Sequence, residues 1–464
     1  MSRVRATTAS ASQLSRLLRL LPAMLCFALL SLPNAGGAET MRATTMQAAR
    51  AQDLLDGFGI NTHLDGCCNG KGGNYNDTDA VIRAIRYIGD VKLLRDFCES
   101  DKLLRIAPRV TRETGAHFWC AIGETRPQGF PEQLALMRRG HRSGWVVAYE
   151  GPNEPDAPYS VSLGGPFLRQ AAGFMPTLYR AARQDGVPAV QTSFGVVWPH
   201  SDYGSTGDLA GYADYGNAHV YPQACPNCLG EGGKGAIAWM DREARKTTPG
   251  KPVAITEWGY TTPASRGYGA VSETVQAAYA LEFILDAHKA GDPYYFYYGL
   301  LNDGAGNFGL FHNDFTPKQA AVALHDFFAL LRDPASDASS FTPGRLDVDL
   351  LGMPPAERNA GGRSALFEKA DGSFWLALWN EQVLNDYRGD NHDLHVAPVP
   401  VTIRFNRSVA AIAEFDPLGH GITPVASGKG RHFTLQLPAH PVLLRIQPGN
   451  SAGELGKTPE PATK

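Results

Sequence analysis

The feature that most constrains this fold is a regular alternation of short apolar runs with longer amphipathic stretches between residues 55 and 330. The runs have the length of strands, and the stretches have the apolar periodicity of helices. Eight strands alternating with helices over about 270 residues are typical of a (β/α)8 barrel. The expected strands are Gly57–His63, Val91–Phe97, Ala116–Ile122, Trp145–Glu150, Ala189–Phe194, Tyr215–Val220, Pro252–Glu257 and Tyr294–Leu300.

A doubly wound parallel sheet would show a similar alternation. Such sheets usually carry a phosphate-binding loop, and no GxGxxG or Walker pattern follows the first expected strand. The sequence therefore predicts an α/β protein built on a TIM barrel. The expected helices include Thr78–Ile88, Phe130–Arg139, Gly165–Gln184, Ile237–Lys246, Ser272–Ala290 and Lys318–Leu331.

The periodicity changes after about residue 335, where a segment rich in Pro, Ser and Asp (Asp333–Gly344) indicates a linker. Short alternating strands follow, and Asp371-Gly372 is a hairpin turn signal between the first two. We assign residues 39–335 to the barrel, 336–448 to an all-β sandwich and 449–464 to a disordered tail. The expected strands of this second domain are Ala365–Glu368, Phe374–Trp379, Val399–Phe405, Val409–Phe415, Arg431–Leu437 and Val442–Ile446.

Residues 1–38 have the pattern of a secretory signal peptide: four arginines, an apolar run from Leu20 to Leu32, and the small residues Ala35–Ala38. An uncleaved N-terminal anchor is the alternative. After cleavage, 39 basic and 46 acidic residues remain, a formal net charge of −7. That charge argues against nucleic acid or an anionic membrane as partner. We expect a periplasmic or secreted protein that acts as a monomer.

Seven cysteines become six when Cys26 leaves with the signal peptide, and an even set in an oxidising compartment favours disulfide bonds. Cys225 and Cys228 form a CxxC pattern, which also occurs in redox and zinc sites. Because no partner motif accompanies it, we interpret it as loop stapling. Cys98 and Cys120 lie near the ends of expected strands and are a further candidate pair; the sequence leaves the connectivity open.

Two carboxylates follow expected barrel strands at the end where active sites of such barrels lie. Glu154 follows the fourth strand in Asn153–Pro155, and Glu257 ends the seventh strand in Thr256–Gly259. A carboxylate at the end of an apolar strand is costly unless it is paired or used. Glycosidic cleavage needs two such groups, one protonated to donate to the leaving oxygen and one ionised to attack the anomeric carbon.

Asn153–Pro155 after strand four, with Glu257 after strand seven, resembles the clan A superfamily of retaining glycoside hydrolases. The outline is most similar to family 39 and its family 5 relatives, on three motifs: Phe58–His63, Asn302–Gly304 followed by Phe308–Leu310, and Thr316–Lys318. The resemblance implies a (β/α)8 barrel, with Glu154 as acid/base and Glu257 as nucleophile. It also implies that Asn153 binds the sugar 2-hydroxyl.

The same resemblance implies roles for further residues: Arg95 holds the nucleophile ionised, Tyr221 hydrogen-bonds it, and His219 lies near the acid/base. Clan members generally have a Trp at strand eight; this chain departs from that, and Tyr297 is the nearest match. Glu150 competes with Glu154 for the acid role, but it lies deeper in its strand and is interpreted as supporting. The remaining candidate sugar contacts are His63, Trp198 and Trp258.

These residues predict a retaining hydrolase that cleaves β-D- or α-L-glycosidic bonds in an oligo- or polysaccharide by double displacement. Two alternatives use the same barrel: a transglycosylase, and a carbohydrate-binding protein without catalysis. No cofactor is expected. No metal is expected either, because no His, Asp and Glu spacing matches a zinc motif. Asp65 and Asp77 lie close enough in sequence to suggest calcium, but their spacing matches no calcium-binding loop.

Overall fold

The computed structural model describes residues 44–66, 75–123, 126–157, 162, 164–193, 203–227, 236–263, 269–302, 306–356, 361–386 and 392–449. The predicted signal peptide (1–38) and residues 450–464 of the predicted tail lie outside the described residues. The barrel and the β-domain belong to one compact unit that begins at Ala43.

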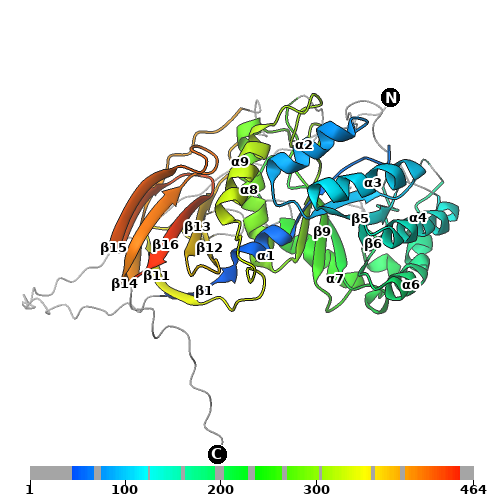
Figure 1. Ribbon diagram of the computed structural model, residues 1–464, viewed down its shortest axis with the longest axis horizontal. Helices are drawn as coiled ribbons and strands as arrows, with labels where there is room; N and C mark the ends of the chain where they lie inside the picture. Colours follow the sequence, from blue (N-terminus) through cyan, green and yellow to red (C-terminus); the bar gives the residue numbers. More distant parts are fainter. Residues whose placement is uncertain are drawn as a thin grey trace, which may run out of the picture. The chain divides into compact units, whose positions relative to one another are not determined.

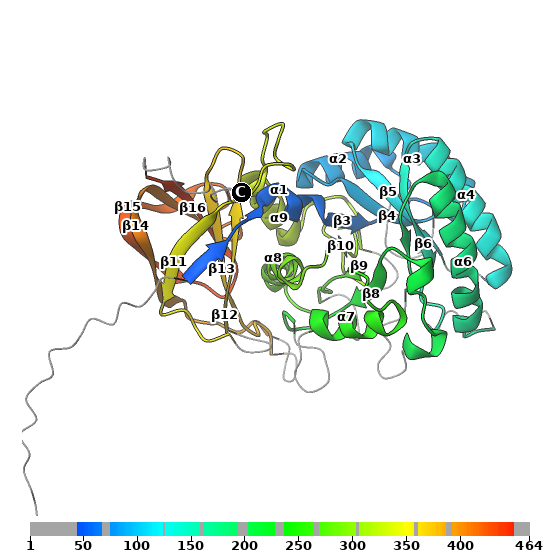
Figure 2. The same cartoon turned by 90° about the horizontal axis from the view of Figure 1, so that it is seen from below.

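Eight parallel strands form the barrel predicted from the sequence (Figures 1 and 2). The strands run β7-β6-β5-β4-β3-β10-β9-β8 around the sheet, and a parallel bridge between Val190 and Tyr215 joins β7 to the start of β8. Their bounds are β3 (Phe58–Asn61), β4 (Leu93–Phe97), β5 (His117–Ile122), β6 (Val146–Pro152), β7 (Ala189–Val190), β8 (Gly216–Val220), β9 (Val253–Trp258) and β10 (Tyr294–Tyr297).

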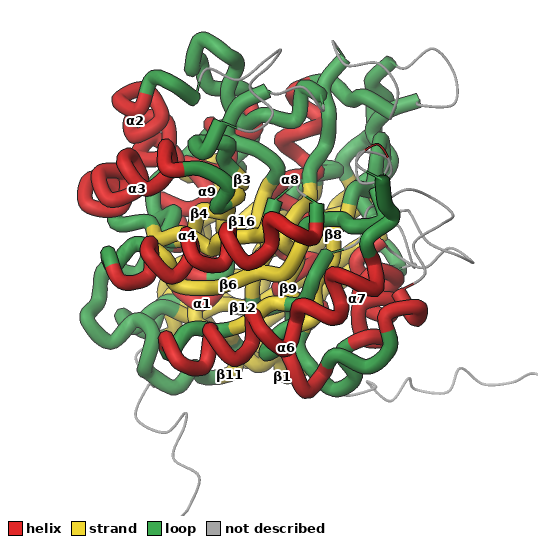
Figure 3. Tube along the Cα trace, turned by 90° about the vertical axis from the view of Figure 1, so that its right-hand side faces the viewer, coloured by secondary structure: helices red, strands yellow, loops and turns green. Residues whose placement is uncertain are grey.

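Helices cover the outside of these strands, as Figure 2 shows, and α4 and α6 lie in front of β6 in Figure 3. Helix α3 was not among the expected helices, although Leu103, Ala107 and Val110 give it one buried face. The helices are α1 (Ala51–Asp56), α2 (Thr78–Ile88), α3 (Asp101–Thr114), α4 (Phe130–Arg142), α6 (Leu168–Asp185), α7 (Ala236–Thr247), α8 (Glu273–Ala290) and α9 (Gln319–Leu331).

The interior of the barrel is filled by large and small side chains that alternate between neighbouring strands. Gly59 on β3 makes room for this packing, because a Cβ there would lie 2.3 Å from the ring of Phe296. The filled interior leaves the strand ends as the place for a site. The interior cluster consists of Trp119, Ala148, Val190, Ala254 and Phe296.

The predicted C-terminal β-domain is present as a second, largely antiparallel sheet of eight strands. Two of them come from the N-terminal side of the barrel: β1 (Thr44–Gln47) pairs with β11, and β2 (Ala49–Arg50) pairs with β12. Residues 44–50, which the sequence assigned to the barrel, therefore extend this sheet. The other strands are β11 (Arg345–Leu351), β12 (Gly361–Glu368), β13 (Phe374–Glu381), β14 (Val399–Phe415), β15 (Pro424–Leu437) and β16 (Val442–Pro448).

Strand β13 shows why the β-domain stays with the barrel. It is buried along its whole length, so both of its faces are covered. Phe374, Leu376 and Leu378 face the core of the β-domain, whereas Trp375 and Trp379 join the hydrophobic cluster of the barrel. The period of two along a strand thus gives one face to each core.

Polar groups are also buried between α8 and the β-domain. Arg363 of β12 forms an ion pair with Glu381 of β13, and its Nε lies 3.7 Å from Oδ1 of Asp286 on α8. Glu282, one turn before Asp286, is completely buried, and neither of its carboxyl oxygens has a hydrogen-bond partner in the described part of the chain. Burial, together with the charges of Glu381 and Asp286, raises the pKa of Glu282 well above its ordinary value.

A disulfide joins Cys98, which follows β4, to Cys120 in β5, as the sequence had suggested. Cys225 is also disulfide-bonded; Cys67, Cys68 and Cys228 lie outside the described residues. Among the residues that the structure describes, no helix has the length and apolar character to cross a membrane.

The buried Glu282 predicts a stability that falls as pH rises. The folded state keeps the proton to a higher pH than the unfolded state, so unfolding releases a proton between the two pKa values. We expect Glu282→Gln to raise the free energy of unfolding by about 1–2 kcal/mol at pH 7, with a smaller gain near pH 4. Urea unfolding at both pH values measures this, with the exposed Glu132→Gln on α4 as control; an equal difference at both pH values would contradict it.

Candidate active site

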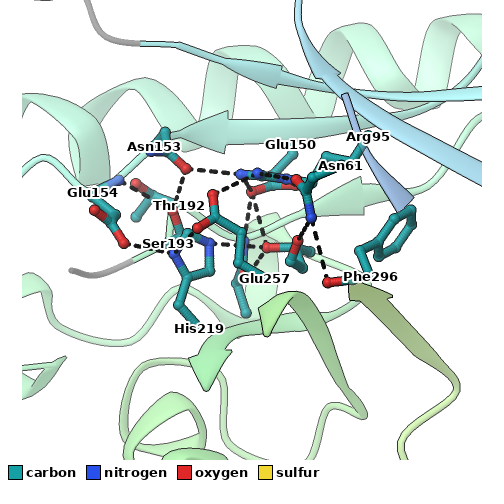
Figure 4. Close-up of polar contacts among 12 residues, drawn as sticks. Asn61, Arg95, Glu150, Asn153, Glu154, Thr192, Ser193, His219, Glu257 and Phe296 are labelled. Carbon is teal, nitrogen blue, oxygen red and sulfur yellow. Dashed lines mark hydrogen bonds and ion pairs between the residues drawn. The ribbon is translucent and has the colours of Figure 1, made fainter. Parts of the chain in front are cut away.

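Arg95 on β4 is the centre of a buried polar network at the mouth of the barrel (Figure 4). Its Nε and Nη2 donate to the two carboxyl oxygens of Glu150 at 2.8 and 2.7 Å. Its Nη1 donates to Glu257 Oε1 at 2.7 Å and to Asn61 Oδ1 at 2.8 Å, and its Nη2 also donates to Asn153 Oδ1 at 2.8 Å. One guanidinium therefore fixes side chains from strands β3, β6 and β9, because the carboxyl ends of parallel strands meet at one rim.

A β-bulge on β9 brings Glu257 into this network. Ile255 and Trp258 on β9 pair with Tyr295 and Tyr297 on β10, so two residues of β9 lie opposite one residue of β10. The extra residue shifts the alternation of side chains along the strand. Thr256 and Glu257 can then both contact residues of the barrel mouth, although they are neighbours in the sequence.

Glu257 is held as an anion by its neighbours. Burial alone would raise its pKa, but the charges of His219 and Arg95 and the hydrogen bonds from Tyr221 and Arg95 together lower the pKa below its ordinary value. The hydroxyl of Tyr221 donates to Oε2 of Glu257 at 2.7 Å, and Nδ1 of His219 lies 3.5 Å from the same oxygen. An ionised carboxylate with fixed orientation is suited to act as a nucleophile.

Glu154 follows β6 in a different environment. Its Oε1 lies 2.7 Å from Nδ1 of His219, and its side chain is 18% exposed against 8% for Glu257. Burial raises its pKa above the ordinary value, against the hydrogen bond and charge of His219, which act in the opposite direction. Its backbone φ of 39° is left-handed, which is strained for a residue other than glycine. Such strain persists where the surroundings hold a residue in place for a task.

Glu154, His219 and Glu257 form the one set of three potential metal-binding side chains in the described part of the chain, with one donor atom of each within 4.8 Å of the others. These atoms already contact one another or protein donors. We therefore interpret the set as a hydrogen-bonded cluster of two carboxyl groups and an imidazole. Two carboxyl groups this close, one ionised and one with a raised pKa, suit acid–base and nucleophilic chemistry on the two atoms of a single bond.

The strand-eight aromatic at the site is Tyr298, one residue beyond the predicted Tyr297. Tyr297 is fully buried, and its hydroxyl donates to the carbonyl oxygen of Phe308 at 2.9 Å. The hydroxyl oxygen of Tyr298 lies 3.2 Å from Nε2 of His63, and the Tyr298 ring packs edge-on against the ring of Tyr221. The prediction that Tyr297 contacts sugar is corrected, because alternation along β10 points Tyr297 outward and leaves Tyr298 at the mouth.

Trp258 does not reach the mouth either. It is fully buried and stacks on Phe283 of α8 with ring centroids 4.2 Å apart, so it packs the outside of β9 instead of forming a sugar platform. The bulge that turns Glu257 inward turns Trp258 outward. Trp198, the other candidate platform, lies outside the described residues.

Three residues of the network were missed in the sequence: Asn61 on β3, Asn217 on β8 and Thr256 on β9. Asn217 donates to Glu150 Oε1 at 3.0 Å, and Thr256 donates to Asn217 Oδ1 at 2.7 Å. Both are fully buried polar residues inside apolar strands, and this is the signal that marks them. The predicted residues Asn153, Arg95, His219, Tyr221 and His63 all lie in or beside the network.

No family model matches the chain, and no curated protein sequence matches it. Solved structures similar to it include a glycoside hydrolase family 17 β-1,3-glucanosyltransferase from Rhizomucor miehei, with 16% identity and a TM-score of 0.43 over 58% of this chain and 96% of that chain. Another is AbfB, a family 51 α-L-arabinofuranosidase from Bifidobacterium longum, with 12% identity and a TM-score of 0.43 over 87% and 99%.

A third is a family 128 endo-β-1,3-glucanase from Amycolatopsis mediterranei, with 13% identity and a TM-score of 0.39 over 58% of this chain and 98% of that chain.

The Arg95 network predicts a large loss of stability when its cation is removed. Arg95→Met leaves Glu150 and Glu257 buried without their counter-charge, and breaking such a pair costs about 3–5 kcal/mol. We expect a loss of that size in the free energy of unfolding, measured in urea. Arg95→Met/Glu150→Gln should recover part of it, because it removes one of the two uncompensated charges. A double variant no more stable than the single one would contradict this assignment.

Proposed function

We propose that this protein is a retaining glycoside hydrolase, with Glu257 as nucleophile and Glu154 as general acid and base. The observation that carries the proposal is the pair itself: carboxyl oxygens from two different strands within 4.8 Å, one group with a lowered pKa and the other with a raised pKa. Retaining enzymes hold their carboxyl groups about 5–5.5 Å apart, whereas inverting enzymes need about 6.5–9.5 Å to admit a water.

In the proposed reaction, a carboxylate oxygen of Glu257 bonds to the anomeric carbon while the bond to the leaving oxygen breaks. Glu154 gives its proton to that leaving oxygen. In the second step Glu154 removes a proton from water, and the water oxygen displaces Glu257 from the anomeric carbon. Two displacements on the same centre retain its configuration. Arg95 and Tyr221 favour the ionised nucleophile at the start and end of the cycle.

The sugar contacts in this proposal come from the same rim. Asn153 Oδ1 accepts from Arg95, which directs its amide group for a sugar hydroxyl next to the reacting carbon. A hydrogen bond of 3.2 Å connects Nε2 of His63 and the hydroxyl of Tyr298, and the two rings form an aromatic wall beside Tyr221. We propose an oligo- or polysaccharide with β-D- or α-L-glycosidic bonds as substrate, in keeping with the resemblance of Asn153–Pro155 to clan A and of the wider outline to families 39 and 5.

We further propose that the protein acts outside the cytoplasm as a monomer. The signal-peptide pattern of residues 1–38 and the disulfide between Cys98 and Cys120 support export. Mass spectrometry of the protein from its own host would show cleavage after the small residues that end at Ala38.

Azide rescue tests the two carboxylate roles. On an aryl glycoside that the wild type cleaves, we expect Glu154→Ala and Glu257→Ala each to lower kcat about 10²–10⁴-fold or more. Azide should restore turnover in both. Glu154→Ala should give a glycosyl azide of retained configuration, and Glu257→Ala one of inverted configuration, because azide then attacks the sugar directly.

Glu132→Gln, an exposed change on α4, is the control. Inverted product from the wild type would overturn the retaining mechanism. Binding of oligosaccharide with no cleavage by the wild type would identify a carbohydrate-binding protein, and transfer to added acceptor sugar would identify a transglycosylase.

Tyr221→Phe should shift the acidic limb of the pH profile. The variant lacks the hydroxyl that donates to Glu257, so the pKa of Glu257 rises and ionisation requires a higher pH. We expect the acidic limb of kcat/KM to move up by about one pH unit, since a hydrogen bond to a charged group contributes about 1.5–3 kcal/mol. The exposed Tyr212→Phe should leave the profile unchanged. A uniform fall in rate without a shift would contradict this role.

A further inference from the structure

A chain of hydrogen bonds connects the acid/base carboxyl to the interior of the barrel. Oε1 of Glu154 lies 2.7 Å from Nδ1 of His219, and Nε2 of the same imidazole lies 3.1 Å from the hydroxyl oxygen of Thr256. The Thr256 hydroxyl lies 2.7 Å from Oδ1 of Asn217 and 3.2 Å from Oε1 of Glu150. His219 and Thr256 are both completely buried, so their contacts with the protein decide where their protons are. Nδ1 of His219 also lies 3.5 Å from Oε2 of Glu257, which only accepts.

The orientation of the Asn217 amide is fixed first. One of its terminal atoms lies 3.0 Å from Glu150 Oε1 and 2.9 Å from the carbonyl oxygen of Gln191. A carboxylate bound by Arg95 and a backbone carbonyl only accept hydrogen bonds, so the atom facing them must be the NH2 group. The carbonyl oxygen of Asn217 therefore faces Thr256.

The Thr256 hydroxyl has one hydrogen and two neighbours that only accept, Asn217 Oδ1 and Glu150 Oε1. The hydroxyl therefore donates its hydrogen toward Asn217 Oδ1 and Glu150 Oε1. Its oxygen accepts a hydrogen bond from His219. The ring nitrogen that faces Thr256 must then carry a hydrogen. The contacts assign the hydrogen of a neutral His219 to Nε2 and leave Nδ1 as an acceptor.

We propose that Thr256 is a positioning residue that fixes the tautomer of His219, so that Glu154 and His219 share a single proton, the one given to the leaving oxygen. This inference rests on the proposed function for the fate of that proton, but the tautomer itself follows from the contacts. With Nδ1 bare, the 2.7 Å contact between Nδ1 and Glu154 Oε1 needs a hydrogen, which lies on either atom of the pair.

With this tautomer, the pair of Glu154 and His219 gives up its shared proton readily and takes one up strongly. When the leaving oxygen takes the proton and the electrons of the broken glycosidic bond, the Glu154 anion faces the lone pair of Nδ1. That repulsion disfavours the deprotonated pair and favours uptake of a proton from the attacking water. A ring with its hydrogen on Nδ1 would instead donate to the Glu154 anion and stabilise the deprotonated state.

Other charges face this pair, and Thr256 variants carry the same set of charged residues. Glu257 of β9 favours protonation of both His219 and Glu154, Asp156 after β6 favours protonation of Glu154, and Arg95 of β4 disfavours protonation of His219. A comparison of Thr256 variants therefore isolates the tautomer from the surrounding field.

Nitrogen NMR of the wild-type protein reads the tautomer without any substrate. In protein labelled with ¹⁵N-histidine, with the His219→Gln variant to assign the signals, we expect the neutral ring to show a protonated Nε2 and an unprotonated Nδ1. A neutral ring protonated at Nδ1 would overturn the inference. Because this readout needs no turnover, a protein with no glycosidase activity would defeat the proposed function and leave the tautomer assignment standing.

Thr256→Val and Thr256→Ser give the matched functional test. Valine keeps the branched shape but removes the hydroxyl, so we expect the ring hydrogen to move to Nδ1 and the basic limb of kcat/KM to move down by about one pH unit. Serine keeps the hydroxyl and should keep both the tautomer and the limb. A valine variant whose basic limb stays in place, or one that loses activity equally at all pH values, would assign Thr256 a packing role only and overturn the proposal.

Discussion

The geometry of the barrel mouth depends on one buried cation. Arg95 has a side chain that is only 2% exposed, and its hydrogen bonds reach Glu150, Glu257 and two asparagines. A buried guanidinium is tolerated only when its donors are used, and here the planar fork binds oxygens at the ends of three strands, β3, β6 and β9. Because Arg95 is shared by two carboxylates, Glu257 is kept ionised while part of the positive charge is balanced by Glu150.

The same mouth gives two chemically identical side chains opposite properties. Glu257 is surrounded by a cation and a hydroxyl donor, which lower its pKa, whereas burial raises the pKa of Glu154. His219 lies between them, 2.7 Å from one and 3.5 Å from the other. Its position couples the two groups, so a proton gained on one side changes the field felt on the other. The opposite shifts in pKa therefore arise from the neighbours and not from the residue type.

The sequence predicted the barrel and most residues of the candidate site. The predictions that failed did so because of local features of individual strands. Helix α2 has the predicted bounds, because its apolar spacing and the Asp77 cap agree. The carboxylates at the ends of β6 and β9 were found because polar residues after apolar strands are conspicuous. A bulge has no such signal: the extra residue in β9 reversed the side-chain directions that alternation implies, which is why Trp258 was misjudged. On β10, alternation was right, but residue type could not fix the register of the five consecutive aromatic residues Tyr294–Tyr298.

Helix α8 extends the site into the rest of the molecule. It follows β9, and Gln276 near its start donates to the carbonyl oxygens of Tyr260 and Phe308, which belong to the loops after β9 and β10. Its other face carries Asp286 against Arg363 of the β-domain. Trp258, directly after the proposed nucleophile, stacks on Phe283 in the middle of the same helix. The β-domain thus buries one side of helix α8, and the other side of this helix packs against the strand of Glu257. Through this shared packing, the β-domain can help to keep Glu257 in place without contacting it.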